Sequence, residues 1–555
     1  MSRLDIETTY IATGSIAKTA TEHKLSYYAA RNIINEMGIT NSVGRPSNES
    51  RKQEPAPVVG GRVHARTTPT GAWKQGQVKR YFLTCAQNNT ALHDQVWDNI
   101  LGLADLYDAE LLVARTVYNR FSMSSAQDKK LIIERNSEDA PAKVRRDYWW
   151  DAKLTPYIHD ERLELAPGLI WCGETNTTPT AADPLSGFDS YTGRASSIFP
   201  HPRVAMRSVP SMMHEPTKLM YTTGTVTQRN YIQRKAGQLA DFHHCYGGLL
   251  VEIDRDGVWF VRQVIANEGG VMCDLDKAID SKGHITKNNR ILAANWGDIH
   301  SACPNPYINK ACWGEGGLVD WLRPETQVFH DLVDFRARNP HMTKKQLYLD
   351  AFIEAVRGNG SVMTEMLKTA EFLRHSYREG CMSLVVDSNH DHMLIEWLER
   401  TGAFRKDPTN AVYFLRAAHH LWSETAKRGG VKPNMTQWAM LDADNALAGL
   451  DLRFLNEDES FVIGDGIELG LHGHEGFNGA RSGPKAFARL GCKLNAGHVH
   501  SAGIWDGAWF SGITGDLNQR YNVGLSGWTH THTLTYGPSG KRAQITMTPS
   551  GRALV

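Results

Sequence analysis

The stretch RILAANWGDIH, residues 290–300, decides the fold class of this 555-residue chain. Its first part, residues 290–296, is a short apolar run typical of a buried strand. The run leads directly into a loop with Asp298 and His300. These two residues are two positions apart, so their side chains can point the same way and bind one cation. The stretch therefore predicts a strand that ends in a pair of metal ligands.

Four further polar blocks follow this stretch, and several come directly after an apolar segment. Their candidate residues are, in chain order, Asp331, then Asn389, His390 and Asp391, then His472, and last His498 and His500. A single block of this kind is weak evidence, because most histidines are surface or core residues held by one hydrogen bond. The order of all five blocks is what indicates a function.

The series D-x-H, D, N-H-D, H-G and G-H-x-H over residues 290–505 resembles the calcineurin-like metallophosphoesterases, which include phosphatases, phosphodiesterases and nucleases. The resemblance implies an α/β fold, a metallophosphoesterase β-sandwich flanked by helices, with two divalent cations that act on a phosphate ester. It implies a first metal surrounded by Asp298, His300, Asp331 and His500, and a second by Asp331, Asn389, His472 and His498. It also implies that His390 protonates or stabilises the leaving oxygen and that Asp391 orients the His390 ring.

Two positions depart from the family pattern, since His330 and Ser388 stand where the family usually has glycine. Asp334 is a lesser alternative to Asp331 in the second block. In the fourth block His474 competes with His472, which is preferred because it precedes glycine directly after the apolar segment. A site of His, Asp and Asn without thiolates favours Mn²⁺, with Mg²⁺, Fe²⁺ or Zn²⁺ as alternatives.

The chain is predicted to have four parts. These are a helix-turn-helix-like basic unit (1–40), a flexible basic linker rich in Pro, Gly and Ser (41–79), a separate α/β domain of open role (80–285), and the metallophosphoesterase catalytic domain with C-terminal strands (286–555). In the third part, strand, helix and strand patterns at 81–85, 91–107 and 110–117 predict a βαβ unit. Residues 248–264 predict a hairpin that turns at 256–257.

The N-terminal part is the predicted contact with nucleic acid. Residues 1–80 contain 12 Lys and Arg against 6 Asp and Glu, whereas the whole chain has 61 against 60. In a helix-turn-helix, the second helix would present its side chains to DNA, and the candidates are Lys24, Tyr27, Tyr28, Arg31 and Asn32. The alternative is a plain helical hairpin used for packing or for contacts between subunits.

The composition is that of a globular protein, with 41% hydrophobic and 22% charged residues. No run approaches the ~18 apolar residues of a membrane helix, and the N-terminus lacks a secretory signal pattern. We therefore expect a soluble protein without a membrane span. The tryptophan- and threonine-rich end is expected to complete the sandwich, with His530 and His532 as structural or surface residues.

The whole chain also resembles the pre-early, host-DNA-degrading DNA transfer proteins of T-five-like bacteriophages. This resemblance implies a deoxyribonuclease of the host bacterial cytoplasm that destroys host DNA and assists phage DNA transfer. It further implies DNA as the substrate, a homo-oligomer, and a possible phage protein partner. Two alternatives stay open, namely a phosphatase or nucleotide phosphodiesterase, and a non-enzymatic DNA-binding regulator whose metal serves folding.

Overall fold

The computed structural model describes residues 72–118, 148–339, 348–400, 402–519 and 522–555, together with a few positions before residue 34. Residues 60–555 form one compact unit and residues 1–59 another. Of the predicted DNA contacts, Lys24 is described, and it is exposed in a turn. Tyr27, Tyr28, Arg31 and Asn32 lie outside the described residues, as does the predicted linker from 41 to 71.

A βαβ unit and a hairpin form a four-stranded sheet in the order β10-β9-β1-β2. The unit comprises β1 (Lys79–Gln87), α4 (Asp94–Tyr107) and β2 (Ala109–Thr116), with the two strands parallel. The hairpin comprises β9 (Gly247–Ile253) and β10 (Trp259–Ile265). Its turn contains Gly257 with φ 85°, a left-handed conformation that glycine adopts without steric cost. Both predicted elements are confirmed.

A six-stranded sheet in the order β17-β16-β15-β14-β24-β25 carries the first three polar blocks. Its strands β14 to β17 are parallel, and β24 and β25 extend it antiparallel. The bounds are β14 (Ala293–Asn295), β15 (Thr326–Phe329), β16 (Met382–Val385), β17 (Leu452–Phe454), β24 (His530–Thr535) and β25 (Arg542–Met547).

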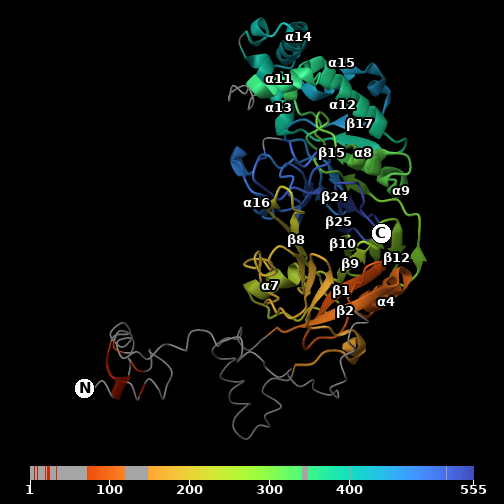
Figure 1. Cartoon of the computed structure of the whole chain (residues 1–555), viewed down its shortest axis with the longest axis vertical. Coiled ribbons are helices and arrows are strands. Elements are labelled where there is room, and N and C mark those ends of the chain that lie inside the picture. The colour runs from red at the N-terminus through yellow and green to blue at the C-terminus, as the bar shows by residue number, and fades with distance from the viewer. Residues whose placement is uncertain are drawn as a thin grey trace. The chain divides into compact units, whose positions relative to one another are not determined.

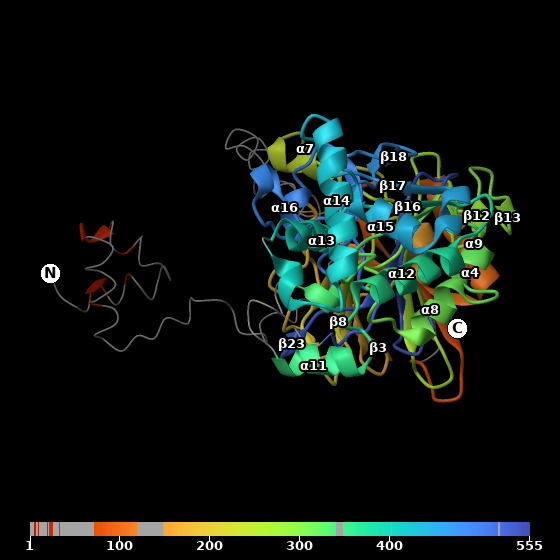
Figure 2. The same cartoon turned by 90° about the horizontal axis from the view of Figure 1, so that it is seen from above.

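Helices connect the parallel strands and cover one face of this sheet. They are α8 (Pro306–Trp313), α9 (Leu318–Leu322), α11 (Tyr348–Val356), α12 (Val362–Ser376), α13 (Asn389–Glu399), α14 (Ala411–Lys427) and α15 (Met435–Ala443). Phe329 and Val385 belong to the core cluster on the helical side, whereas their neighbours Val328 and Leu384 pack on the opposite face against β19. This alternation is what a strand buried on both faces requires. Figure 1 and the view from above in Figure 2 show α12 to α15 grouped beside β16 and β17.

The opposite face packs against part of a ten-stranded sheet, in the order β18-β19-β20-β22-β21-β6-β8-β5-β4-β3. The bounds are β3 (Arg162–Ala166), β4 (Leu169–Cys172), β5 (Ser196–Phe199), β6 (Ala205–Val209), β8 (Lys218–Thr222), β18 (Val462–Ile463), β19 (Ile467–Glu468), β20 (Lys493–Ala496), β21 (Gly503–Trp505) and β22 (Ala508–Phe510). The chain is thus a mixed α/β protein with several sheets.

The prediction of a separate domain at 80–285 is wrong in one respect. One sheet contains strands from both sides of the predicted boundary at residue 285. Strand β6 pairs antiparallel with β21, and Ile504 lies opposite Met206. Pairing satisfies backbone N–H and C=O groups that would otherwise lie at an open sheet edge. The two predicted domains therefore share one sheet.

The remaining α-helices and strands lie outside these three sheets. They are β7 (Ser211–Met212), α7 (Lys235–Phe242), β11 (Met272–Asp274), β12 (Lys277–Ile279), β13 (Ile285–Thr286), α16 (Pro484–Phe487) and β23 (Leu525–Ser526). Within the described ranges, no helix is long and apolar enough to cross a bilayer.

His530 and His532 are buried on β24. The backbone N–H of Gly297 donates to Nδ1 of His532 at 3.0 Å, and Nδ1 of His530 lies 2.9 Å from the carbonyl of Ile513. Burial lowers the pKa of His532 to about 3, so this imidazole stays neutral and can accept that bond. The two histidines have the predicted structural role, and His532 fixes the backbone just before Asp298.

Candidate metal centre

All five polar blocks follow the carboxyl ends of strands. Asp298 follows β14, Asp331 follows β15, and Asn389 opens α13 after β16. His472 follows β19, and the G-H-V-H block follows β20. The first three strands are parallel neighbours in one sheet, while β19 and β20 are parallel neighbours in the other. The site is therefore formed where corresponding ends of two packed sheets meet.

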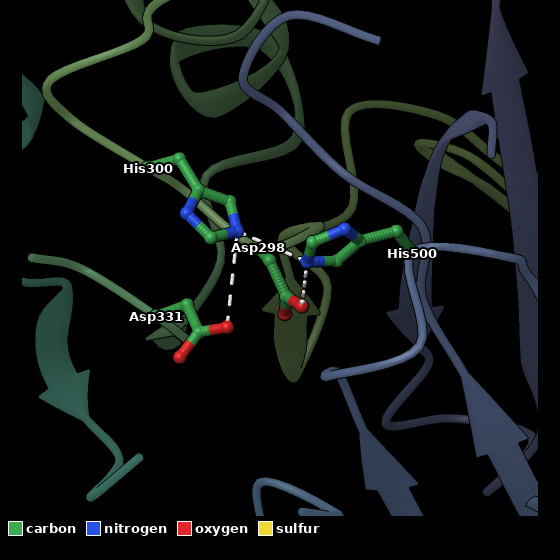
Figure 3. Close-up of side chains that lie close together, drawn as sticks. All are labelled: Asp298, His300, Asp331 and His500. Carbon is green, nitrogen blue, oxygen red and sulfur yellow. Dashed lines mark hydrogen bonds and ion pairs between the residues drawn. The ribbon is translucent and has the colours of Figure 1, made fainter. Parts of the chain in front are cut away.

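The first group of ligand atoms is fully buried and is drawn in Figure 3. It consists of Asp298, His300, Asp331 and His500, whose candidate ligand atoms all lie within 4.8 Å of one another. Nε2 of His500 lies 2.9 Å from Nε2 of His300 and 2.9 Å from Oδ2 of Asp298. Nε2 of His300 lies 3.8 Å from Oδ2 of Asp331. These are the four residues predicted around one metal.

The second group shares Asp331 with the first. It consists of Asp331, His472 and His498. Nε2 of His472 lies 3.2 Å from Oδ1 of Asp331 and 3.2 Å from Oδ1 of Asn389. The two oxygens of Asp331 thus face different histidines, one in each group. His474, the competitor of His472, belongs to neither group.

The polar atoms of the first group fit a cation better than they fit one another. Nδ1 of His300 lies 2.8 Å from Oδ1 of Asp334, so Nδ1 is the natural donor and Nε2 keeps a lone pair. That lone pair faces Nε2 of His500, and the same Nε2 also lies 2.9 Å from Oδ2 of Asp298, so a single N–H would have to serve two acceptors. Buried polar atoms without partners are costly. A divalent cation would satisfy all of them at once.

The ionisation states of the side chains are also those that a cation site requires. Burial lowers the pKa of His472 to about 3 and the pKa values of His498 and His500 to about 4. These imidazoles are therefore neutral near pH 7, the form that binds metals. Burial and the nearby charge of Asp331 raise the pKa of Asp298 well above its usual range. Two carboxylates this close repel each other when both are ionised, and a cation between them would remove that repulsion.

Strained backbone marks the same residues. Left-handed φ angles occur at Asp331 (43°), His300 (49°), His500 (56°) and His498 (72°). A non-glycine residue in a sparsely populated conformation costs about 1–3 kcal/mol, and such residues cluster at functional sites. The strain places four proposed ligands on sharp turns instead of on regular strands.

Gly497 allows the closest approach in the site. A Cβ atom at this position would lie 2.1 Å from Oδ1 of Asp298 and 3.0 Å from Cβ of His330. Only glycine lets the G-H-V-H loop lie against both the first and second blocks. His330, the departure from the family pattern, is buried, and neither of its ring nitrogens has a hydrogen-bond partner.

His390 is held by a different partner from the one predicted. Its Nδ1 lies 3.1 Å from the carbonyl oxygen of Asp334, which can only accept, so Nδ1–H donates. Burial alone would lower the pKa of His390, but the carboxylates of Asp331 and Asp334 raise it above its usual value. The side chains of His300, Asp334 and His390 converge within 4.8 Å. His390 therefore lies beside the first group with Nε2 available.

The predicted role of Asp391 as the orienting partner of His390 is wrong. Oδ2 of Asp391 accepts from the backbone N–H and the hydroxyl of Ser388, each at 2.9 Å, and Oδ1 accepts from Thr436 at 2.7 Å. Asp391 is the third residue of α13, where a carboxylate reaches back to cap the helix start. It thus fixes the segment that carries Asn389 and His390.

Asp334 is the residue that sequence reasoning underestimated. The sequence offers it as an alternative metal ligand, but its carboxylate lies behind His300 and its carbonyl holds His390. Its second oxygen accepts from the backbone N–H of Ala302 at 3.2 Å. The D-x-x-D spacing after β15 was the available signal, but spacing alone does not distinguish a ligand from a ligand's partner.

Asp334→Ala is expected to weaken binding of the first metal by roughly 10- to 100-fold, because His300 loses the partner that fixes its tautomer and ring orientation. The measurement is a calorimetric titration of the purified full chain with Mn²⁺. Asp256→Ala, at an exposed turn position, is the control. Equal Mn²⁺ affinity in Asp334→Ala and wild type would contradict this role.

The fold and the site together define a mixed α/β protein with a buried double cluster of Asp, His and Asn side chains. The chain is 36% identical to Protein A1 of Escherichia phage T5 over 485 residues, which cover 85% of this chain and 82% of the relative. The chain belongs to the family of that phage protein. No protein-family model and no solved structure matches the chain. The name of the relative gives no activity, so a proposal of activity rests on the site.

Proposed function

We propose that this protein is a deoxyribonuclease that hydrolyses DNA phosphodiester bonds with two divalent cations, preferably Mn²⁺. The observation that carries the proposal is the position of Asp331, whose two oxygens face the two groups of ligand atoms. One shared carboxylate between two cation sites is the arrangement that a two-metal hydrolase requires.

We assign the side chains two kinds of role, metal binding and proton transfer. Asp298, His300, Asp331 and His500 would hold one cation, and Asp331, Asn389, His472 and His498 the other. Such a pair of cations supplies Lewis acidity toward a phosphate ester. His390 donates through Nδ1 to Asp334, so its Nε2 is the nitrogen that can pass a proton to the leaving oxygen.

Charge and family favour DNA over a small phosphate ester. Residues 1–80 are basic, with 12 Lys and Arg against 6 Asp and Glu, which suits a polyanion. The chain belongs to a phage protein family, so host DNA in the bacterial cytoplasm is the proposed substrate, with assistance of phage DNA transfer as the associated role. We further propose that the enzyme works as a homo-oligomer and acts together with a phage protein partner.

Digestion of plasmid and linear DNA tests the proposal. Wild-type protein is expected to degrade both with Mn²⁺ and to leave both intact in excess EDTA, because the neutral imidazoles and carboxylates of the site need a cation to act. p-Nitrophenyl phosphate and free nucleotides are assayed in parallel. Cleavage of these small esters without cleavage of DNA would identify a phosphatase. DNA binding without hydrolysis of any substrate under every metal would identify a regulator.

A further inference from the structure

A cavity of about 330 Å³ lies beside the second group of ligand atoms. Its lining includes His472, and it extends along the loop 470–479 to Phe487 and Leu490. Small-molecule pockets typically measure about 300–1,000 Å³, so the cavity has the size of a site for one small ligand. Of the residues that line the cavity, His472 is a proposed metal ligand, and the others have no role in the proposed reaction.

The loop is fixed closely against the sheet. Gly473 has φ 106°, and a Cβ atom there would lie 3.0 Å from Cε1 of Phe510. A Cβ atom at Gly470 would lie 2.3 Å from the carbonyl oxygen of Glu459. These glycines allow His472 to reach Asp331 while the following residues of the loop line the cavity. Any ligand in the cavity would therefore lie next to the proposed reaction centre.

One side of the cavity is aromatic and apolar. Phe477 is 40% exposed, although large apolar side chains in this part of the fold are mostly buried. The guanidinium of Arg489 lies 5.3 Å from the centroid of the Phe477 ring. Phe487 and Leu490 line the same cavity. An exposed ring supported by an arginine is a platform on which a planar base can stack.

The other side carries hydrogen-bond acceptors. Glu457, Asp458 and Glu475 line it, together with Asp387, whose Oδ2 already lies 2.8 Å from Nε2 of His392. These carboxylates repel a phosphate group, yet they can accept hydrogen bonds from the N–H groups of a nucleobase.

A metal ion fits this cavity less well than a base does. In the described part of the chain, the groups of three or more ligand atoms within 4.8 Å of one another are those around Asp298, Asp331 and Asp334, and they include no carboxylate of the cavity. The cavity carboxylates are therefore too dispersed to surround one ion. The combination of an exposed ring and dispersed acceptors matches a neutral, planar ligand.

We propose that this cavity binds the base of an unpaired or flipped-out nucleotide adjacent to the phosphodiester that the metal centre cleaves. The inference rests on the proposed nuclease function and names its substrate class, DNA with an unpaired nucleotide. A base within a duplex cannot enter a pocket of this size, so it must leave the stack. Frayed ends, gaps and single strands are then cleaved faster than an intact duplex.

Binding of deoxyadenosine to metal-free full-length protein tests the proposal without any need for catalysis. Calorimetry in EDTA compares deoxyadenosine with deoxyribose 5-phosphate. Wild-type protein is expected to bind the nucleoside and not the sugar phosphate. Phe477→Ala is expected to weaken nucleoside binding by about tenfold or more, through loss of the stacking surface. Phe242→Ala, at an exposed phenylalanine of α7 that does not line the cavity, is the matched control.

Three results would overturn the base site. They are absence of deoxyadenosine binding to wild type, equal binding by Phe477→Ala, and preferential binding of the sugar phosphate. A count of bound Mn²⁺ in Glu475→Gln addresses the cation alternative, because loss of one ion from this variant would assign the cavity to a metal. Phe477→Leu, which keeps the apolar bulk but loses the ring, replaces Phe477→Ala if that variant does not fold.

Failure of the nuclease proposal gives a different set of experimental results from failure of the base site. A protein that binds deoxyadenosine through Phe477 but leaves all DNA substrates intact has the base site without the nuclease. A protein that cleaves duplex and single-stranded DNA at equal rates and does not bind the nucleoside is a nuclease without this site.

Discussion

Replacing Asp331 by asparagine is expected to lower kcat/KM for manganese-dependent DNA cleavage by about 10³-fold or more, since the cations supply several kcal/mol of transition-state stabilisation and each 1.36 kcal/mol is tenfold in rate. The reason is structural. Oδ1 of Asp331 lies 3.2 Å from Nε2 of His472, and Oδ2 lies 3.8 Å from Nε2 of His300. An amide keeps the shape but loses the charge and one acceptor, so at most one group keeps an oxygen ligand from this residue and neither keeps its negative charge.

The measurement combines cleavage rates with the number of Mn²⁺ ions bound per chain, obtained by elemental analysis after gel filtration. We expect about two ions in wild type and fewer in Asp331→Asn, consistent with a site of two cations. Asp256→Asn, in the exposed turn between β9 and β10, is the matched carboxylate control. A variant with both ions and wild-type rates would show that the two groups do not share this carboxylate.

The local parts of the fold could be predicted because they depend on neighbouring residues. The apolar runs before Asp298 and Asn389 are β14 and β16, and the βαβ unit and hairpin occur where their patterns indicate. The resemblance of the five ordered blocks to the metallophosphoesterases implied the two ligand sets. The structure brings most of those side chains together in two groups that share Asp331.

The contacts between distant segments could not be predicted in the same way. Met206 and Ile504 pair across β6 and β21, and no local pattern indicates a pairing over such a sequence separation. The predicted boundary at residue 285 rested on local sequence patterns and therefore missed the sheet that the two parts share. In the same way, His532 fixes the backbone of Gly297 from the far end of the chain.

Asp334 holds His390 in place of the predicted Asp391, and this difference has a local physical cause. Asp391 follows His390 directly, but it is the third residue of a helix, and there its carboxylate caps Ser388. Asp334 lies in the loop after β15, where its carbonyl and carboxylate are free to serve two different histidines. A residue's neighbour in sequence is thus a poor guide to its neighbour in the site when both lie in the first turn of a helix.

His390→Ala is expected to reduce kcat for DNA cleavage by roughly 10²- to 10⁴-fold, the usual contribution of a positioned general acid or base, while both metals stay bound. His390 is hydrogen-bonded to the carbonyl of Asp334 and belongs to neither of the two groups that share Asp331, so its removal takes no candidate ligand from them. Loss of activity with unchanged Mn²⁺ content distinguishes this variant from Asp331→Asn. His419→Ala, at an exposed histidine of α14, is the control.

The leaving group separates proton donation from a merely structural role of His390. A deoxyribose oxygen leaves as a strong base and needs a proton, whereas p-nitrophenolate is stable without one, so a lost general acid harms the first reaction more. We therefore expect His390→Ala to retain far more of its activity on bis(p-nitrophenyl) phosphate than on DNA. An equal loss on both substrates would assign His390 to positioning of the site, because distortion of the metal ligands slows every ester alike.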